Sequence, residues 1–279
     1  MHSKYFLINL ILVFLSLSPI FTNAQSSFTT ADSISQVPSF MQDVESGYNT
    51  GIKIVTAPFS FDTKDWIITG AVLSTTALAY LVDKDNREFW ARNHNKSLDG
   101  IGNVGEFYGE IRNAAIFSGA IYLGGKIADS KELSVTGRML FEGLFFAGLT
   151  TTLIKSFSGR SRPYTNDGYN HFKLFQTNND YTSFPSGHTT VAFTLTSILS
   201  NRINNTYVSI GLYTLAVTTV MQRMYSDNHW LSDTILGASI GYFIGQAVVK
   251  FDDDVQNSGI TVNPCFIPDG FGLNIAYIL

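Results

Sequence analysis

The chain has 279 residues, of which 45% are hydrophobic, 14% aromatic and only 14% charged. This composition excludes a disordered chain, because the apolar side chains can fill a core, and it favours association with a membrane. The net charge of −4 argues against nucleic acid as a partner, since phosphate backbones are bound by basic surfaces.

The first 24 residues have the pattern of a secretory signal peptide. Lys4 precedes an almost wholly apolar run over residues 5–17, Pro19 interrupts it, and small residues lead to Ala24. The run is shorter than the roughly 20 residues that span a bilayer, which favours cleavage after Ala24 over an uncleaved anchor helix. Either interpretation exports the chain. The single cysteine, Cys265, fits an exported fold without an internal disulfide.

The body of the chain is predicted to be helical. Residues 25–64 are polar and are interpreted as a lead-in with at most a short helix near residues 39–48. Six apolar segments of helical length follow, without the alternation typical of strands, which predicts an all-α bundle of about six core helices over residues 65–251. The segments are Trp66–Val82, Ala114–Gly124, Met139–Ile154, Thr189–Leu199, Tyr207–Met221 and Leu231–Val249.

These segments do not decide by themselves between a membrane protein and a soluble bundle. Trp66–Val82 and Leu231–Val249 are suited to a membrane span by their length and low charge. Ala114–Gly124 and Thr189–Leu199 are short for a span, and Glu142 lies inside the third segment. A multi-pass protein and a soluble exported bundle both remain open.

The last helical segment contains three glycines spaced four residues apart, Gly237, Gly241 and Gly245. Such a stripe allows another helix to approach closely. We interpret it as tight packing inside the bundle.

The last 28 residues, 252–279, change to a pattern typical of strands. Gly259–Ile267 is strand-like, residues 268–270 (Pro-Asp-Gly) form a turn signal, and Phe271–Leu279 alternates. The pattern predicts a short C-terminal β-hairpin, which we expect to cover the bundle. The alternative is a relic of an outer-membrane strand.

Cationic residues occur at the ends of the apolar segments, where loops meet helices. Lys155, Arg162 and Arg223 would bind a dianion such as phosphate if they converged. Ser186 and Gly187 precede a helix, whose free N–H groups and dipole favour the same anion. Taken singly, each cation is better explained as a solvated residue at a helix end.

A histidine and an aspartate follow at helical spacing. His229 and Asp233 are four residues apart, so on a helix the carboxylate would fix the imidazole tautomer and leave the other nitrogen as a nucleophile. A surface pair and a metal pair are the alternatives, but the remaining histidines show no ligand-like spacing, and no metal is expected. His188 at a helix start is a candidate general acid or a structural residue.

Together these residues resemble the signature of the type 2 phosphatidic acid phosphatase and vanadium haloperoxidase superfamily. That signature reads K-x6-R-P, then P-S-G-H, then S-R-x5-H-x3-D. The matching residues are Lys155, Arg162, Pro163, Pro185–His188, Arg223, His229 and Asp233. Gln222 stands where the family usually has serine, and the effect of this difference is left open. The resemblance covers about residues 139–249.

The resemblance implies a helical bundle with its site between helices, and it implies a role for each matching residue. His229 would attack phosphorus and form a phosphohistidine, Asp233 would orient it, and His188 would protonate the leaving oxygen. No metal would be required, because fixed donors and cations stabilise the developing charge. The residues implied to hold the phosphoryl oxygens are Lys155, Arg162, Ser186, Gly187 and Arg223.

The expected function is therefore that of an exported phosphatase in the bacterial cell envelope. Membrane-like composition favours a phosphorylated lipid substrate, of the phosphatidic acid or isoprenyl pyrophosphate type, and a membrane-associated or multi-pass chain. A soluble chain would instead be a broad-specificity periplasmic acid phosphatase. The alternative chemistry is a vanadium-dependent haloperoxidase, with vanadate as cofactor on His229; otherwise no cofactor is expected. A non-catalytic envelope protein is disfavoured, because every charged and histidine position of the signature is present.

Overall fold

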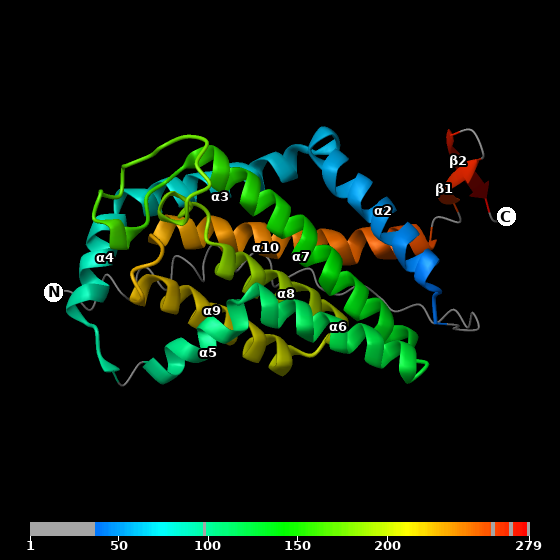
Figure 1. Ribbon diagram of the computed structural model, residues 1–279, viewed down its shortest axis with the longest axis horizontal. Coiled ribbons are helices and arrows are strands. Elements are labelled where there is room, and N and C mark those ends of the chain that lie inside the picture. The colour runs from blue at the N-terminus through cyan, green and yellow to red at the C-terminus, as the bar shows by residue number, and fades with distance from the viewer. Residues whose placement is uncertain (1–36, 97–98, 258–259, 268–269, 278–279) are drawn as a thin grey trace.

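The computed structural model describes residues 37–96, 99–257, 260–267 and 270–277 (Figure 1). The predicted signal peptide, residues 1–24, lies outside these residues, as does the start of the polar lead-in. The described chain contains nine α-helices, which confirms the all-α class. They are α2 (Phe40–Thr56), α3 (Thr63–Leu81), α4 (Asp83–Arg92), α5 (Asp99–Gly109), α6 (Ile111–Ile127), α7 (Lys131–Ser158), α8 (Gly187–Ile203), α9 (Thr206–Tyr225) and α10 (Leu231–Asn257).

The expected number of about six core helices was wrong. The six apolar segments correspond to α3, α6, α7, α8, α9 and α10, whereas α2, α4 and α5 are additional. The reason is local composition, because α4 is largely charged and α5 has four glycines in eleven residues, so neither contains a long apolar run. Helix α5 nevertheless packs along α9, with Gly105 and Gly109 buried.

Helix α8 is the centre of the bundle. It packs against α10, α7 and α9 (Figure 1). Every side chain from Thr189 to Leu199 is buried. One apolar cluster forms around Phe193 on the side of α9 and α10, and another around Ile198 and Met139 on the side of α7. The N-terminal end of α8 is thereby held in a fixed position between three helices.

The glycine stripe of α10 lies directly against α8. A Cβ atom added at Gly237, Gly241 or Gly245 would come within 3.0 Å of atoms of α8 or its N-cap residue. The interpretation as tight packing inside the bundle is therefore confirmed. The close approach also brings Asp233, one turn before Gly237, to the start of α8, where its carbonyl accepts a hydrogen bond from the Ser186 N–H at 2.9 Å.

Helix α2 is longer than the short helix expected in the polar lead-in, and it is attached to the bundle through charges. Its first turn is closed by a capping box between Ser39 and Gln42. Asp43 of α2 is buried and forms ion pairs with Lys126 at 2.6 Å and with Arg138 at 3.2 Å. The polar face of α2 therefore points inward, which explains why its sequence resembles a solvated segment.

Two described helices, α7 and α10, are long and apolar enough to cross a membrane, and the pair α3 and α4, bent by 57°, would make a third span. The charge of Glu142 inside α7 does not face outward, because Glu142 is buried and paired with Arg138 at 2.9 Å. The outer face of α7 instead carries exposed apolar side chains at helical spacing. They are Phe141, Phe145, Leu149, Leu153 and Phe157.

The C-terminal residues form two antiparallel strands, β1 (Ile260–Ile267) and β2 (Gly270–Tyr277), with Ile260 opposite Tyr277. Figure 1 shows this pair beyond the end of α10 and not over the helical body. Strand β1 contacts α2, so the pair meets the bundle at this helix and does not cover it, contrary to the expectation.

Candidate active site

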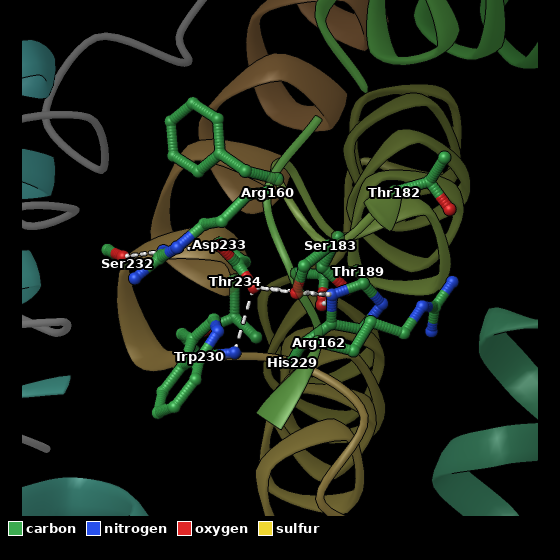
Figure 2. Close-up of polar contacts among 12 residues, drawn as sticks. Arg160, Arg162, Thr182, Ser183, Thr189, His229, Trp230, Ser232, Asp233 and Thr234 are labelled. Carbon is green, nitrogen blue, oxygen red and sulfur yellow. Dashed lines mark hydrogen bonds and ion pairs between the residues drawn. The ribbon is translucent and has the colours of Figure 1, made fainter. Parts of the chain in front are cut away.

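The candidate site lies where the C-terminal end of α7, the N-terminal end of α8 and the junction of α9 and α10 meet. Helix α7 ends at Ser158, and its C-cap residue, Gly159, adopts a left-handed conformation with φ of 57°. A side chain there would collide with the backbone of Lys173, so only glycine allows this turn. The turn returns the chain toward the bundle and brings Arg160 and Arg162 to the site (Figure 2).

His229 and Asp233 form the buried centre of the site. The Nδ1 atom of His229 lies 3.5 Å from Oδ2 of Asp233 and 3.4 Å from the Ser183 hydroxyl oxygen. His229 is 3% exposed and Asp233 is fully buried. Since both oxygens face Nδ1, the second ring nitrogen, Nε2, is the one left for chemistry.

The Asp233 carboxylate accepts hydrogen bonds on both of its oxygens. Oδ1 accepts from the Arg160 guanidinium at 2.6 Å. Oδ2 accepts from the Ser183 hydroxyl at 2.5 Å and from the Trp230 N–H at 2.8 Å, as the dashed lines of Figure 2 show. A carboxylate held at this many points cannot rotate freely, so it fixes the orientation of the His229 ring.

Arg160 is a site residue that the sequence analysis did not identify. Its guanidinium is fully buried between two carboxylates, Asp233 and Asp83, the latter at 2.7 Å. Asp83, the first residue of α4, also accepts the N–H and hydroxyl of Ser232 at 2.9 and 2.6 Å. No local signal identifies Asp83, because it lies 77 residues before Arg160 and outside the signature.

Two of the predicted phosphate-binding cations reach the site from either side of Gly159. Lys155, in the last turn of α7, donates from Nζ to the Thr182 carbonyl at 2.5 Å. Arg162 donates to the backbone carbonyl and side-chain oxygen of Asn179 at 2.8 and 2.9 Å. These bonds anchor both side chains beside the site.

The start of α8 faces the same place. A Cβ atom added at Gly187 would lie 3.6 Å from Cε of Lys155. Ser186, the N-cap residue, makes no side-chain cap hydrogen bond, and its hydroxyl accepts instead from Thr189 at 3.0 Å. The first-turn N–H groups of α8 are therefore not occupied by the cap side chain and are suited to bind an anion.

Arg223, at the end of α9, is held by two neighbours. Its Nε donates to the side-chain oxygen of Gln222, and its Nη2 lies 3.2 Å from Oε2 of Glu106 on α5. The Gln222 amide in turn donates to Glu106 at 2.8 Å. Gln222, at the position where serine is usual, thus links Arg223 to Glu106 of α5 through two hydrogen bonds.

His188, the second residue of α8, faces a carboxylate of its own. Its Nε2 atom lies 3.4 Å from Oε2 of Glu110, the residue between α5 and α6. Burial, together with the charges of Arg223 and Arg162, lowers the pKa of His188 to about 4, although Glu110 and Glu106 raise it. The ring is therefore neutral at pH 7.

Electrostatics also keep His229 neutral. Burial is the largest cause that lowers the pKa of the His229 ring, and the charges of Lys155 and Arg162 act in the same direction, while Asp233 opposes them. A neutral imidazole is the nucleophilic form. The cations that would bind a phosphoryl group thus also favour the neutral form of the His229 ring, which is the form that would attack phosphorus.

The structure brings the eight predicted site residues to one region of the bundle. Ser186 joins Asp233 through a hydrogen bond, and a Cβ added at Gly187 would be in van der Waals contact with Lys155. The three cations and two histidines interact electrostatically. In the part of the chain that the structure describes, no three His, Cys, Asp or Glu side chains group as a metal site.

Residues 137–256 match the family model of the PAP2 superfamily, which confirms the resemblance noted from the sequence. The match runs from α7 into α10. It includes every predicted site residue, but it leaves out α4 and α5, which contribute Asp83, Glu106 and the segment before Glu110.

Two curated proteins show similarity in sequence. A lipid A 1-phosphatase from Rhizobium johnstonii is 31% identical over 119 residues, which cover 41% of this chain and 47% of that protein. A lipid A 4'-phosphatase from Porphyromonas gingivalis is 25% identical over 122 residues, which cover 43% of this chain and 52% of that protein. The chain thus spans about half the length of these curated relatives.

A solved structure shares the fold. The crystal structure of a transmembrane PAP2-type phosphatidylglycerolphosphate phosphatase from Bacillus subtilis superposes with a TM-score of 0.53 at 17% identity. The superposition covers 67% of this chain and 96% of that chain. The likeness extends beyond the family match, to helices that precede α7.

Proposed function

We propose that the protein is a phosphatase that hydrolyses phosphorylated lipids without a metal ion, because residues 137–256 match the family model of the PAP2 superfamily. The observation that carries this proposal is the buried His229 ring. Its Nδ1 faces Asp233 and Ser183, and the charges of Lys155 and Arg162 act on it. A nucleophile beside fixed cations is suited to attack a phosphoryl group.

The proposed reaction has two displacements at phosphorus. In the first, His229 Nε2 attacks phosphorus, the bond to the leaving oxygen breaks, and His188 gives that oxygen a proton. In the second, water attacks the phosphohistidine, its proton passes to His188, and the P–N bond breaks to release inorganic phosphate. The guanidinium and ammonium groups of Arg162, Arg223 and Lys155 stabilise the charge on the three equatorial oxygens throughout.

A lipid substrate and a place in the membrane of the cell envelope belong to the same proposal. The outer face of α7 is apolar, and α7 and α10 have the length and hydropathy of membrane spans. The two curated relatives are named for phosphatase action on lipid A, at different positions. Phosphatidic acid, an isoprenyl pyrophosphate and lipid A phosphates are therefore the substrates to compare.

We expect the purified protein to release phosphate from these lipids in detergent micelles at the same rate with and without a metal chelator. Turnover should exceed that of para-nitrophenyl phosphate by about tenfold or more, because contacts to the lipid supply binding energy for the reaction. Vanadate, which resembles the pentacoordinate phosphoryl state, should inhibit. The assay is inorganic phosphate release with and without chelator and vanadate.

Three other results would change the proposal. Faster turnover of para-nitrophenyl phosphate than of any lipid would favour a broad-specificity periplasmic acid phosphatase. Halide oxidation that requires added vanadate would favour the haloperoxidase. Dependence on a divalent metal would contradict the proposed chemistry directly.

Replacing Gln222 by alanine should raise KM for the lipid substrate by about tenfold or more, with a smaller change in kcat. The reason is that Gln222 holds Nε of Arg223 and joins it to Glu106, and hydrogen bonds to charged groups contribute about 1.5–3 kcal/mol. Steady-state kinetics measure the effect. Gln222→Ser, the residue usual in the family, is the matched control and should retain more affinity than alanine. An unchanged KM in Gln222→Ala would show that substrate binding by Arg223 does not depend on its hydrogen bond to Gln222.

A further inference from the structure

Glu110 is held in place by the start of α6. It is the N-cap residue of that helix, and its Oε1 atom accepts from the N–H of Arg112 at 3.4 Å and from Nε of Arg112 at 3.2 Å. The other oxygen, Oε2, points to Nε2 of His188 at 3.4 Å. One carboxylate thus caps a helix with one oxygen and faces a histidine with the other.

The His188 ring faces Glu110 with its buried edge. The side chain is 27% exposed, yet Nε2 itself is buried and has no hydrogen-bond partner among the described residues. Glu110 Oε2 is therefore the acceptor that an Nε2–H group would take after a small rotation, since a buried N–H needs a partner. The second ring nitrogen, Nδ1, then belongs to the accessible part of the ring.

Close packing of the backbone holds Glu110 and His188 next to each other. A Cβ atom added at Gly109 would lie 2.9 Å from the His188 carbonyl oxygen and 3.0 Å from its Cβ. The backbone that leads into Glu110 is therefore pressed against His188. Helix α5 lies against α9 and α8, so this contact is part of the bundle and not of a loose loop.

Burial is the largest cause that lowers the pKa of His188, and charged side chains around the ring act in both directions. Arg223 of α9 and Arg162 of the loop after α7 favour the neutral ring, whereas Glu110 and Glu106 favour the protonated ring. A general acid must carry a proton when the substrate is bound. A bound phosphate dianion adds negative charge beside the ring, and Glu110 acts in the same direction.

We propose that Glu110 is a positioning residue for His188, holding Nε2–H so that Nδ1 faces the leaving oxygen and carries the proton to it. On the leaving-group side of the site, Glu110 faces one ring nitrogen of His188, just as Asp233 faces one ring nitrogen of His229. Glu110 lies outside residues 137–256, so this carboxylate comes from a part of the chain that the family model does not match. The inference rests on the proposed phosphatase function and deepens it.

The test compares two leaving groups in Glu110→Gln. Glutamine can still cap α6 through its side-chain oxygen but removes the charge. An alkyl phosphate such as phosphatidic acid needs its leaving oxygen protonated, whereas para-nitrophenolate leaves without a proton. We expect kcat/KM, which reports the steps up to loss of the leaving group, to fall by about 10- to 100-fold on the alkyl phosphate and by less than about threefold on para-nitrophenyl phosphate. Equal losses on both substrates would indicate a structural role and overturn the proposal.

A second readout does not depend on turnover. The chain has five histidines, so NMR titration of labelled imidazoles can follow His188 alone after assignment with a His188→Asn variant. The pKa of His188 should be lower in Glu110→Gln than in the parent, because the removed carboxylate stabilises the protonated ring. Glu88→Gln, which removes an exposed carboxylate paired with Arg92, is the control and should change neither readout.

The two readouts separate the proposals. A parent protein that releases no phosphate from any substrate would contradict the proposed function, and the NMR titration would still test Glu110. An active parent whose Glu110→Gln variant keeps the His188 pKa and the same preference between leaving groups would overturn the inference alone.

Discussion

Replacing His229 by alanine is expected to lower kcat for phosphate release by about 10⁴-fold or more, with little change in folding. The expected loss is this large because the variant has no nucleophile, and removal of a nucleophile in comparable covalent mechanisms costs several orders of magnitude. The other imidazole of the site, His188, faces Glu110 and not Asp233, so it is not placed to act in place of His229. The measurement is phosphate release by the purified variant, with its melting temperature as a check on folding.

Two further experiments make this prediction sharper. Acid-quenched parent enzyme incubated with labelled substrate should carry an acid-labile phosphoryl group, and His229→Ala should carry none. His94→Ala is the matched control, because His94 stacks on Tyr225 and lies outside the site, and it should retain parental turnover. Hydrolysis by His229→Ala at close to the parental rate would disprove the phosphohistidine mechanism.

The second large effect is expected at Arg160. Arg160→Met should destabilise the protein by about 3–5 kcal/mol and abolish turnover, because removing one member of a buried ion pair leaves uncompensated charge. Here two fully buried carboxylates, Asp83 and Asp233, lose their shared partner. The measurement is the free energy of unfolding or the melting temperature in detergent, together with phosphate release.

A double variant separates stability from catalysis. Adding Asp83→Asn to Arg160→Met removes one of the unpaired charges and should recover part of the lost stability, while turnover stays low because Asp233 still lacks its guanidinium partner. Arg160→Lys keeps the charge but cannot reach both carboxylates with a planar fork, and it should fall between the parent and Arg160→Met. A melting temperature unchanged in Arg160→Met would contradict the structural role assigned to this residue.

The connection from Arg160 to Asp83 also explains why α4, which lies outside the family match at residues 137–256, matters to the candidate site. Asp83 opens α4 directly after the bend from α3, and it accepts the N–H and hydroxyl of Ser232 in the first turn of α10. The bent pair α3 and α4 is thereby fastened to the helix that carries Asp233. The first half of the chain supports the site through buried polar contacts at a distance in sequence.

The sequence by itself determined the features that depend on the spacing of residues close together in the chain, namely the apolar helices and the pairs of site residues within one helix turn. Long apolar runs specify helices because their side chains need a partner surface, and α3 and α6 to α10 follow from that pattern. His229 and Asp233 come together because residues four apart lie near each other where a helix begins. The position of Ser186 and Gly187 at a helix start likewise follows from local sequence.

Only the tertiary structure decided which distant groups complete the site. Asp83 reaches Arg160 across 77 residues, and Glu106 reaches Gln222 across 116. Neither α4 nor α5 has an apolar run that marks it as a core helix. The glycines of α5 are explained only by the close approach of this helix to α9 and His188. Periodicity specifies which face of a helix is buried, but not which helix covers that face. The partners of Arg160, Arg223 and His188 are therefore set by how the helices pack.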